Sequence, residues 1–167
     1  MTWYWAGQSF SVGDAEALVA SGVVGFVYQI TNLKDGRKYI GQKKFLSRRS
    51  KKPLKGKKRR RITVIDSDWQ DYWGSNKELQ KDIEILGKEN FSRVILYLAP
   101  SKAMMNYVEL YHQVVTHSLL EPTRYYNEYV GGRISRKQLE KFCNDSLFDR
   151  HQDSDVAGPP LYSRSGV

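Results

Sequence analysis

The spacing of apolar and polar residues along the chain predicts a few strands that alternate with helices. Residues 25–31 are rich in β-branched and aromatic side chains, and residues 37–41 resume this pattern after an Asp-Gly turn. Such a pair of segments is typical of a β-hairpin. Residues 91–98 predict a third strand, and residues 62–65 return briefly to β character. We therefore expect a central, mainly antiparallel sheet of three strands.

Helical periodicity is clearest in the segment that begins at Ser75. Ser75 and Glu78 are spaced as a capping box, apolar residues then recur on one face, and Gly87 marks the end. A second long helix is predicted over residues 102–119, with a buried stripe formed by Met104, Val108, Tyr111 and Val115. With helices flanking the sheet, the expected fold class is α/β, of the α+β kind.

Composition divides the chain into a folded part and two flanks. We expect residues 1–24 to be an N-terminal extension with a short helix, and residues 25–132 to be the folded domain. Residues 133–167 would hold a short helix over 135–142 and then a disordered tail, because Asp, Ser, Gly and Pro dominate beyond residue 144. A chain of 167 residues with 40% apolar residues fits one globular domain.

Cysteine content and hydropathy bear on where the protein works. A single cysteine, Cys143, excludes an internal disulfide bond and a thiolate metal site. The N-terminus lacks a basic flank and a sustained apolar run, and no later stretch approaches the roughly 18 apolar residues of a membrane span. We expect a soluble protein without an export signal, which acts in a reducing cytoplasm.

Positive charge is concentrated in one segment of the chain. The net charge is +9, yet twelve of the 27 Lys and Arg residues lie in residues 43–61, where no acidic residue occurs, and removing those twelve charges from +9 leaves −3. We expect an exposed loop there that binds nucleic acid, while a solvated basic surface or a localisation patch is the alternative. The expected contacts are Lys43, Lys44, Arg48, Lys51, Lys52, Lys55, Lys57, Lys58, Arg59, Arg60 and Arg61.

Residues 66–74 form an aromatic and acidic connector after the basic segment. Its Trp69, Tyr72 and Trp73 could stack on nucleic-acid bases. Aromatic residues in such connectors more often serve as lids over a small core. We therefore expect these three rings to pack.

Two tyrosine triads flank the Asp-Gly turn of the predicted hairpin. They are Phe26-Val27-Tyr28 and Tyr39-Ile40-Gly41, with about ten residues between them, so that both phenols would face one surface. In this respect the sequence resembles the GIY-YIG nuclease family, whose signature is a pair of such triads on neighbouring strands of a small sheet. Phe-Val replaces Gly-Ile in the first triad, whereas its tyrosine and the whole second triad match.

The resemblance implies catalytic roles for five residues. Tyr28 would be the general base, and Tyr39 would orient the water or the phosphate. Arg49 lies eight residues after the second triad, where the family carries its catalytic arginine on a helix, and would bind the scissile phosphate. Glu109 matches the family's metal-binding carboxylate and would hold Mg²⁺ or Mn²⁺. Asn127 matches the asparagine that often closes the family's pattern and would support the site by hydrogen bonds.

Two details of this assignment stay open at the level of sequence. Arg48 is an adjacent competitor for the role of Arg49. A free tyrosine has a pKa of about 10 and is a poor base at neutral pH, so that Tyr28 needs nearby positive charge. Lys43, Lys44 or a metal-bound water could help, either by favouring the phenolate or by accepting its proton.

By this resemblance the function is hydrolysis of phosphodiester bonds in DNA by a metal-dependent endonuclease. The basic segment and the aromatic connector make the chain look most like the free-standing homing endonucleases of bacteriophages, which would place its action in the cytoplasm of a bacterial host. Restriction and repair nucleases share the same core. One alternative is a nucleic-acid-binding protein that cleaves nothing, and another is a component of a phage or ribonucleoprotein particle.

Overall fold

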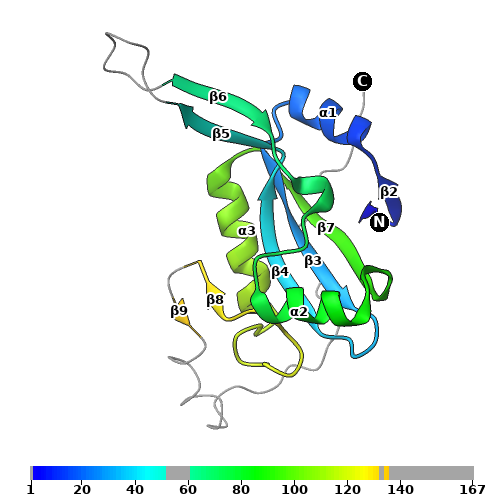
Figure 1. The fold of residues 1–167 in the computed structure, drawn as a ribbon. Helices are drawn as coiled ribbons and strands as arrows, with labels where there is room; N and C mark the ends of the chain where they lie inside the picture. The colour runs from blue at the N-terminus through cyan, green and yellow to red at the C-terminus, as the bar shows by residue number, and fades with distance from the viewer. Residues whose placement is uncertain (1, 52–60, 132–133, 136–167) are drawn as a thin grey trace.

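The computed structural model describes residues 2–51, 61–131 and 134–135, and its centre is a five-stranded mixed sheet. The strands of this sheet are β1 (Trp3–Trp5), β2 (Gln8–Phe10), β3 (Gly25–Asn32), β4 (Lys38–Lys44) and β7 (Phe91–Ala99). Their spatial order is β2-β1-β7-β3-β4, which leaves β4 at one edge (Figure 1). β3 pairs antiparallel with both β4 and β7, which confirms the predicted antiparallel centre.

An N-terminal hairpin extends this sheet beyond its three predicted strands. β1 runs parallel to β7 and pairs with β2 across a two-residue turn at Ala6 and Gly7, both of which have positive φ. Strands of three residues are too short to show a period of two, so the sequence pattern does not reveal them. The hairpin carries Trp3 and Phe10 into the core, where they are 2% and 5% exposed.

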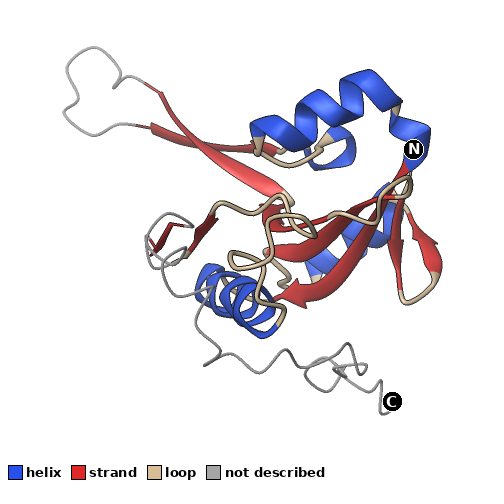
Figure 2. Ribbon diagram, turned by 90° about the horizontal axis from the view of Figure 1, so that it is seen from below, coloured by secondary structure: helices blue, strands red, loops and turns tan. Residues whose placement is uncertain are grey.

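Three α-helices cover the two faces of the sheet (Figures 1 and 2). They are α1 (Val12–Ala20), α2 (Lys77–Leu86) and α3 (Lys102–Val115). α3 packs on one face, where Val27 and Ile40 of the sheet meet Val108. The other face carries the larger, aromatic core, to which α1, α2 and the short 3₁₀ helix η1 (Trp69–Asp71) contribute. A second 3₁₀ helix, η2 (Lys88–Asn90), connects α2 to β7.

The start of α2 differs from the predicted capping box. Asn76, not Ser75, is the N-cap, and its side chain accepts a hydrogen bond from the Leu79 N–H. Asparagine caps a helix as well as serine does, and the Ser75 hydroxyl lies instead 3.2 Å from that of Tyr39. The predicted end at Gly87 is confirmed, with φ at +84°.

The buried face of α3 is also displaced from the prediction. The helix ends at Val115 rather than residue 119, and its buried residues are Met105, Val108 and Gln113. Met104 and Val115, expected in the buried stripe, are 38% and 36% exposed. The buried face of α3 includes a polar residue that the apolar pattern does not count. The Gln113 amide donates a hydrogen bond of 3.3 Å to the Ile40 carbonyl inside the core.

β5 (Leu46–Lys51) and β6 (Arg61–Asp66) form a separate antiparallel ribbon that projects from the domain (Figures 1 and 2). The expected loop over residues 43–61 is therefore wrong at both of its described ends. Its basic residues there lie in strands, with Lys43 and Lys44 in β4, Arg48, Arg49 and Lys51 in β5, and Arg61 in β6. The β-branched residues 62–65 provide the partner strand, so that backbone groups pair with each other instead of with water.

Several predictions fall outside the described residues. Among the expected nucleic-acid contacts these are Lys52, Lys55, Lys57, Lys58, Arg59 and Arg60. β8 (Tyr129–Val130) pairs antiparallel with β9 (Ile134–Ser135). Ser135, the first residue of the predicted C-terminal helix, therefore lies in a strand, and the rest of that helix and the predicted tail fall outside the described residues. In the described part of the chain, no helix is long and apolar enough to cross a membrane.

Candidate active site

Tyr28 and Tyr39 lie on the same face of the sheet because of the register between β3 and β4. Tyr28 pairs with Gly41, and Ile30 pairs with Tyr39. Directly opposed residues of an antiparallel pair share a face, and so do residues two apart along one strand. The two phenol rings consequently approach each other, with centroids 6.2 Å apart. The predicted juxtaposition of the two tyrosines is confirmed.

Gly41 leaves the space that the phenol of Tyr28 occupies. A Cβ atom built on Gly41 would lie 2.5 Å from the Tyr28 hydroxyl oxygen and 2.8 Å from its Cζ, closer than real Cβ contacts come. The same Cβ would lie 3.0 Å from the ring of Tyr39. The glycine of the second triad is therefore a steric requirement of the tyrosine pair, because any side chain there would push the Tyr28 ring away.

Gly41→Ala is expected to destabilise the protein by about 1–3 kcal/mol, the usual cost of overpacking a close-packed site. The free energy of unfolding, measured by urea denaturation, tests this. Gly13→Ala is the matched control, since a Cβ on Gly13 in α1 would meet nothing closer than the Ser11 hydroxyl at 3.8 Å. Equal stability of the two variants would contradict the steric argument.

Burial dominates the electrostatics of Tyr28. The side chain is 1% exposed and packs edge-on against Trp3 and Tyr72, with ring centroids 5.2 and 6.1 Å away. Desolvation, the nearby groups of Tyr39, Tyr72 and Glu109, and a hydrogen bond with Tyr72 raise the pKa of Tyr28 well above 10. Burial also raises the pKa of Tyr39, although its hydrogen bond with Ser75 opposes the shift. Both phenols are therefore neutral in the free protein at physiological pH.

Glu109 approaches the site from α3, on the opposite face of the sheet. Its Oε2 accepts a hydrogen bond of 2.5 Å from the side chain of Gln42 in β4. The same Gln42 amide donates to Asn106 at 2.9 Å, and its oxygen accepts from Lys102 at 2.8 Å. Burial raises the pKa of Glu109, and the hydrogen bond from Gln42 and the charge of Lys102 oppose that shift.

The tyrosine pair and the carboxylate converge at the β4 edge of the sheet. Tyr28 and Tyr39 belong to one face and Glu109 to the other, but the charge of Glu109 acts on both phenols and helps to raise the pKa of each. Beyond Ile40, the side chain of Gln42 links β4 to α3. Two phenol hydroxyl groups on one face and a carboxylate on the other are thus brought to the last strand of the sheet.

Asn127 holds the edge strand β4 in place. The side chain is 2% exposed, accepts a hydrogen bond from the Ile40 N–H at 3.0 Å and donates one to the Ile40 carbonyl at 2.8 Å. These are the two backbone groups that a neighbouring strand would otherwise pair. Asn127 therefore fixes the strand that carries Tyr39 and Gly41.

Asn127→Ala is expected to cost about 1–3 kcal/mol of stability, because it removes the acceptor of the buried Ile40 N–H and the shorter of the two hydrogen bonds that the Ile40 carbonyl accepts. Asn127→Asp keeps the acceptor but loses the donor, so it should remain destabilising. Urea denaturation of both variants measures the effect. A wild-type midpoint for the alanine variant would show that water replaces the amide at this edge.

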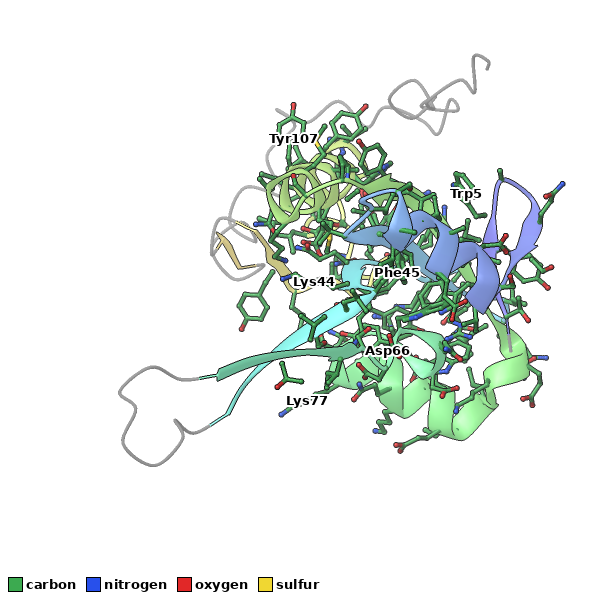
Figure 3. All side chains as sticks on the ribbon, turned by 90° about the horizontal axis from the view of Figure 1, so that it is seen from above. Trp5, Lys44, Phe45, Asp66, Lys77 and Tyr107 are labelled. Atoms are coloured by element: carbon green, nitrogen blue, oxygen red, sulfur yellow. The ribbon has the colours of Figure 1, made fainter. Side chains whose placement is uncertain are left out.

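The described basic residues divide between the site and the ribbon. Lys43 contacts Asp68 at 2.6 Å and lies 3.6 Å from the centroid of the Tyr72 ring. Arg49 belongs to β5, where it pairs with Thr63, and not to a helix as the resemblance implied. Figure 3 shows the ribbon leaving the domain beyond the labelled Phe45 and Asp66. The structure therefore joins Tyr28, Tyr39 and Glu109 but places the Arg49 backbone outside their cluster.

Three neighbours of this cluster were not assigned to the site from the sequence. Gln42 follows the second triad directly, and this position in the sequence could have indicated that it belongs to the site. Tyr72 was expected to pack, which it does, but its contact with Tyr28 depends on a fold across 44 residues of chain. The sequence around Lys102 does not indicate a role in the site. Lys102 comes close to Gln42 because the chain bends between β7 and α3.

The donor set fits a single divalent ion bound by one carboxylate. No group of three or more His, Cys, Asp or Glu side chains could hold a metal among the residues that the structure describes. Mg²⁺ commonly uses one or two carboxylates and completes its shell with waters and substrate phosphates. The raised pKa of Glu109 shows that its charge is poorly compensated in the free protein, and a bound cation would provide that compensation.

Comparison with known proteins identifies a family and a relative of similar sequence. Residues 3–130 match a family model described as "Putative endonuclease segE, GIY-YIG domain". The curated protein "Putative endonuclease segE" of Enterobacteria phage T4 is 34% identical over 109 residues, which cover 64% of this chain and 42% of that protein. The match thus spans less than half of the relative's length. No solved structure matches the chain.

Proposed function

Because the chain belongs to the GIY-YIG domain family of SegE, we propose that it is an endonuclease that hydrolyses phosphodiester bonds in DNA with a divalent metal ion, Mg²⁺ or Mn²⁺. The observation that carries the proposal is the placement of Tyr28 and Tyr39 on one face and Glu109 on the other face of the sheet at β4, its last strand. A homing-type role in a phage-infected bacterial cytoplasm extends the proposal and is supported by the relative from phage T4.

In this mechanism the protein positions a water for attack on the scissile phosphorus. Tyr28 first loses its phenol proton to solvent, and the phenolate then accepts a proton from that water while Tyr39 orients it, so that a new P–O bond forms as the bond to the leaving oxygen breaks. The departing oxygen takes a proton from solvent. Glu109 would hold the metal ion, which would supply positive charge to the phosphate. Asn127 keeps β4, and with it Tyr39, in place.

Binding of DNA is assigned to the basic residues along β4 and the ribbon. Lys43 and Lys44 lie at the site, and Arg48, Lys51 and Arg61 lie on the two strands that lead away from it. A two-stranded antiparallel ribbon has the width to enter the major groove of DNA. Contacts with phosphates would supply affinity that falls as salt concentration rises.

Conversion of supercoiled plasmid to nicked and linear forms tests the proposed activity. Wild-type protein is expected to cleave in Mg²⁺ or Mn²⁺ and to stop in EDTA. Retention of DNA in gel-shift assays that do not depend on metal, with no cleavage of plasmids of diverse sequence, would instead support a non-catalytic nucleic-acid-binding protein.

A further inference from the structure

Tyr28 requires a positive charge close to its phenol, and the backbone of Arg49 lies on β5, a strand of the projecting ribbon. A buried phenol loses its proton only if a cation stabilises the phenolate. Arg49 lies eight residues beyond Gly41, and eight residues of extended chain span up to about 26 Å. Those residues leave the domain along β5, past the labelled Lys44 and Phe45 (Figure 3). A cation carried by the central sheet is therefore the nearer candidate to serve the tyrosine pair.

We propose that Lys43 is the cation that contacts the scissile phosphate beside Tyr28, that Tyr72 positions it, and that Asp68 occupies its ammonium group until DNA arrives. This inference rests on the proposed function, since it assigns a further residue to that same site. In this proposal Lys43 is a catalytic residue. The ribbon, which includes Arg49, binds DNA outside the cleavage site.

Strand register selects Lys43 over its neighbour Lys44. Lys43 pairs with Phe26, two positions along from the pair of Gly41 with Tyr28, so it belongs to the face that carries both tyrosines. Lys44 alternates to the other face, where its charge helps to lower the pKa of Lys102. Only one of the two lysines thus shares a face with the proposed base.

Contacts of the Lys43 side chain hold it next to Tyr28 through one intervening ring. Its Nζ lies 3.6 Å from the centroid of Tyr72, and the Tyr72 ring meets that of Tyr28 edge-on at 6.1 Å. The Tyr72 side chain also hydrogen-bonds with Tyr28. A cation over an aromatic face is attracted by the ring quadrupole, so Tyr72 keeps the ammonium group near the phenol.

Asp68 is suited to give way to a phosphate. The Lys43 side chain is 16% exposed, whereas that of Asp68 is 74% exposed. Ion pairs with one partner in water are weak, and a DNA phosphate offers the same ammonium a competing anion. Lys43 would then donate a hydrogen bond to a non-bridging phosphate oxygen, while the proton of the attacking water passes to the Tyr28 phenolate.

A double-mutant cycle on DNA affinity tests the exchange without reference to cleavage. The probe is a short DNA duplex of mixed sequence, with binding measured in EDTA. Asp68→Asn removes the competing anion and is expected to tighten binding about threefold in the wild-type background, and to change nothing in Lys43→Ala. In Lys44→Ala the tightening should persist. Equal effects of Asp68→Asn in all three backgrounds would overturn the inference.

Single-turnover cleavage at saturating DNA tests the catalytic part. Lys43→Ala is expected to lose about 100-fold in rate, the usual cost of removing one donor to a developing oxyanion. Lys43→Arg should recover part of the loss, and Arg49→Ala should lose less rate than Lys43→Ala. A wild-type rate for Lys43→Ala would overturn the inference alone. An inactive wild-type protein would overturn the proposed function, and the binding cycle would then decide whether Lys43 meets phosphate.

Discussion

Tyr28→Phe is expected to reduce DNA cleavage by about 100- to 10,000-fold, the range that a positioned general base contributes. The variant removes one hydroxyl oxygen and keeps the ring that packs against Trp3 and Tyr72. The fold should therefore survive, with a loss of about 1 kcal/mol or less for the hydrogen bond with Tyr72. Single-turnover cleavage, together with urea denaturation of the same protein, separates the chemical effect from the structural one.

The pH dependence of the wild-type rate follows from the same residue. Burial raises the pKa of Tyr28 well above 10, so fewer than about one molecule in a thousand carries the phenolate at pH 7. The rate should rise by about tenfold per pH unit from about pH 6 to pH 9, as the phenolate fraction grows. A plateau near neutral pH would show that another group accepts the proton.

Stability at alkaline pH provides a measurement of Tyr28 that needs no substrate. The folded protein holds the phenol proton more tightly than the unfolded chain does, so unfolding becomes easier as pH rises past about 10, where the unfolded phenol ionises. Tyr28→Phe lacks this contribution, and its urea midpoint should fall less steeply above that pH. Tyr97→Phe, on the neighbouring strand β7 and the other face, is the matched control and should retain wild-type cleavage.

Local patterns predicted the part of the site that lies within one hairpin. Tyr28 and Tyr39 are brought together by alternation and an Asp-Gly turn, both of which are visible in the sequence. Their pairing with Gly41 adds the steric reason for the glycine. Contacts within a hairpin need only the strand period and the turn length, and so they can be predicted without the rest of the fold.

Longer-range parts of the site depended on contacts that no local pattern encodes. Asn127 was matched to the site, but its two bonds to Ile40 join residues 87 positions apart, so its structural role was visible only in the fold. The face of α3 was predicted from apolar residues alone, and the buried amide of Gln113 turned Met105 inward in place of Met104. Polar residues with buried partners are invisible to hydrophobic periodicity.

The position of Arg49 shows the same limit in another form. A spacing of eight residues from the second triad equals the family's spacing, but the distance in space depends on the structure between them. Here the β-branched residues 62–65 offer β5 a partner, and the chain continues as an extended ribbon instead of turning back as a helix. Spacing along a sequence predicts proximity only when the secondary structure of the intervening chain is known.

Glu109→Gln is expected to abolish metal-dependent cleavage, with a loss of about 1,000-fold or more, because a neutral amide binds Mg²⁺ far more weakly than a carboxylate does. DNA affinity in EDTA should stay near that of the wild type, since the basic residues are untouched. The size and hydrogen-bonding reach of the side chain are preserved, so the amide still fits beside Gln42. Glu84→Gln, at an exposed position of α2, is the matched control for loss of one negative charge.

Metal binding at Glu109 should also be visible as a change in stability. Burial raises the folded-state pKa of Glu109, so this group stabilises the fold fully below its unfolded value of about 4.5, and that contribution is lost as pH rises through the folded pKa. At neutral pH the apo protein carries this cost, which Glu109→Gln removes, and Mg²⁺ offsets it in the wild type. Mg²⁺ at a concentration of ten times its Kd should raise the free energy of unfolding of the wild type by about 1.4 kcal/mol. The same concentration should not measurably change that of the Gln variant. Equal stabilisation of both proteins by Mg²⁺ would place the metal elsewhere, whatever the cleavage assay shows.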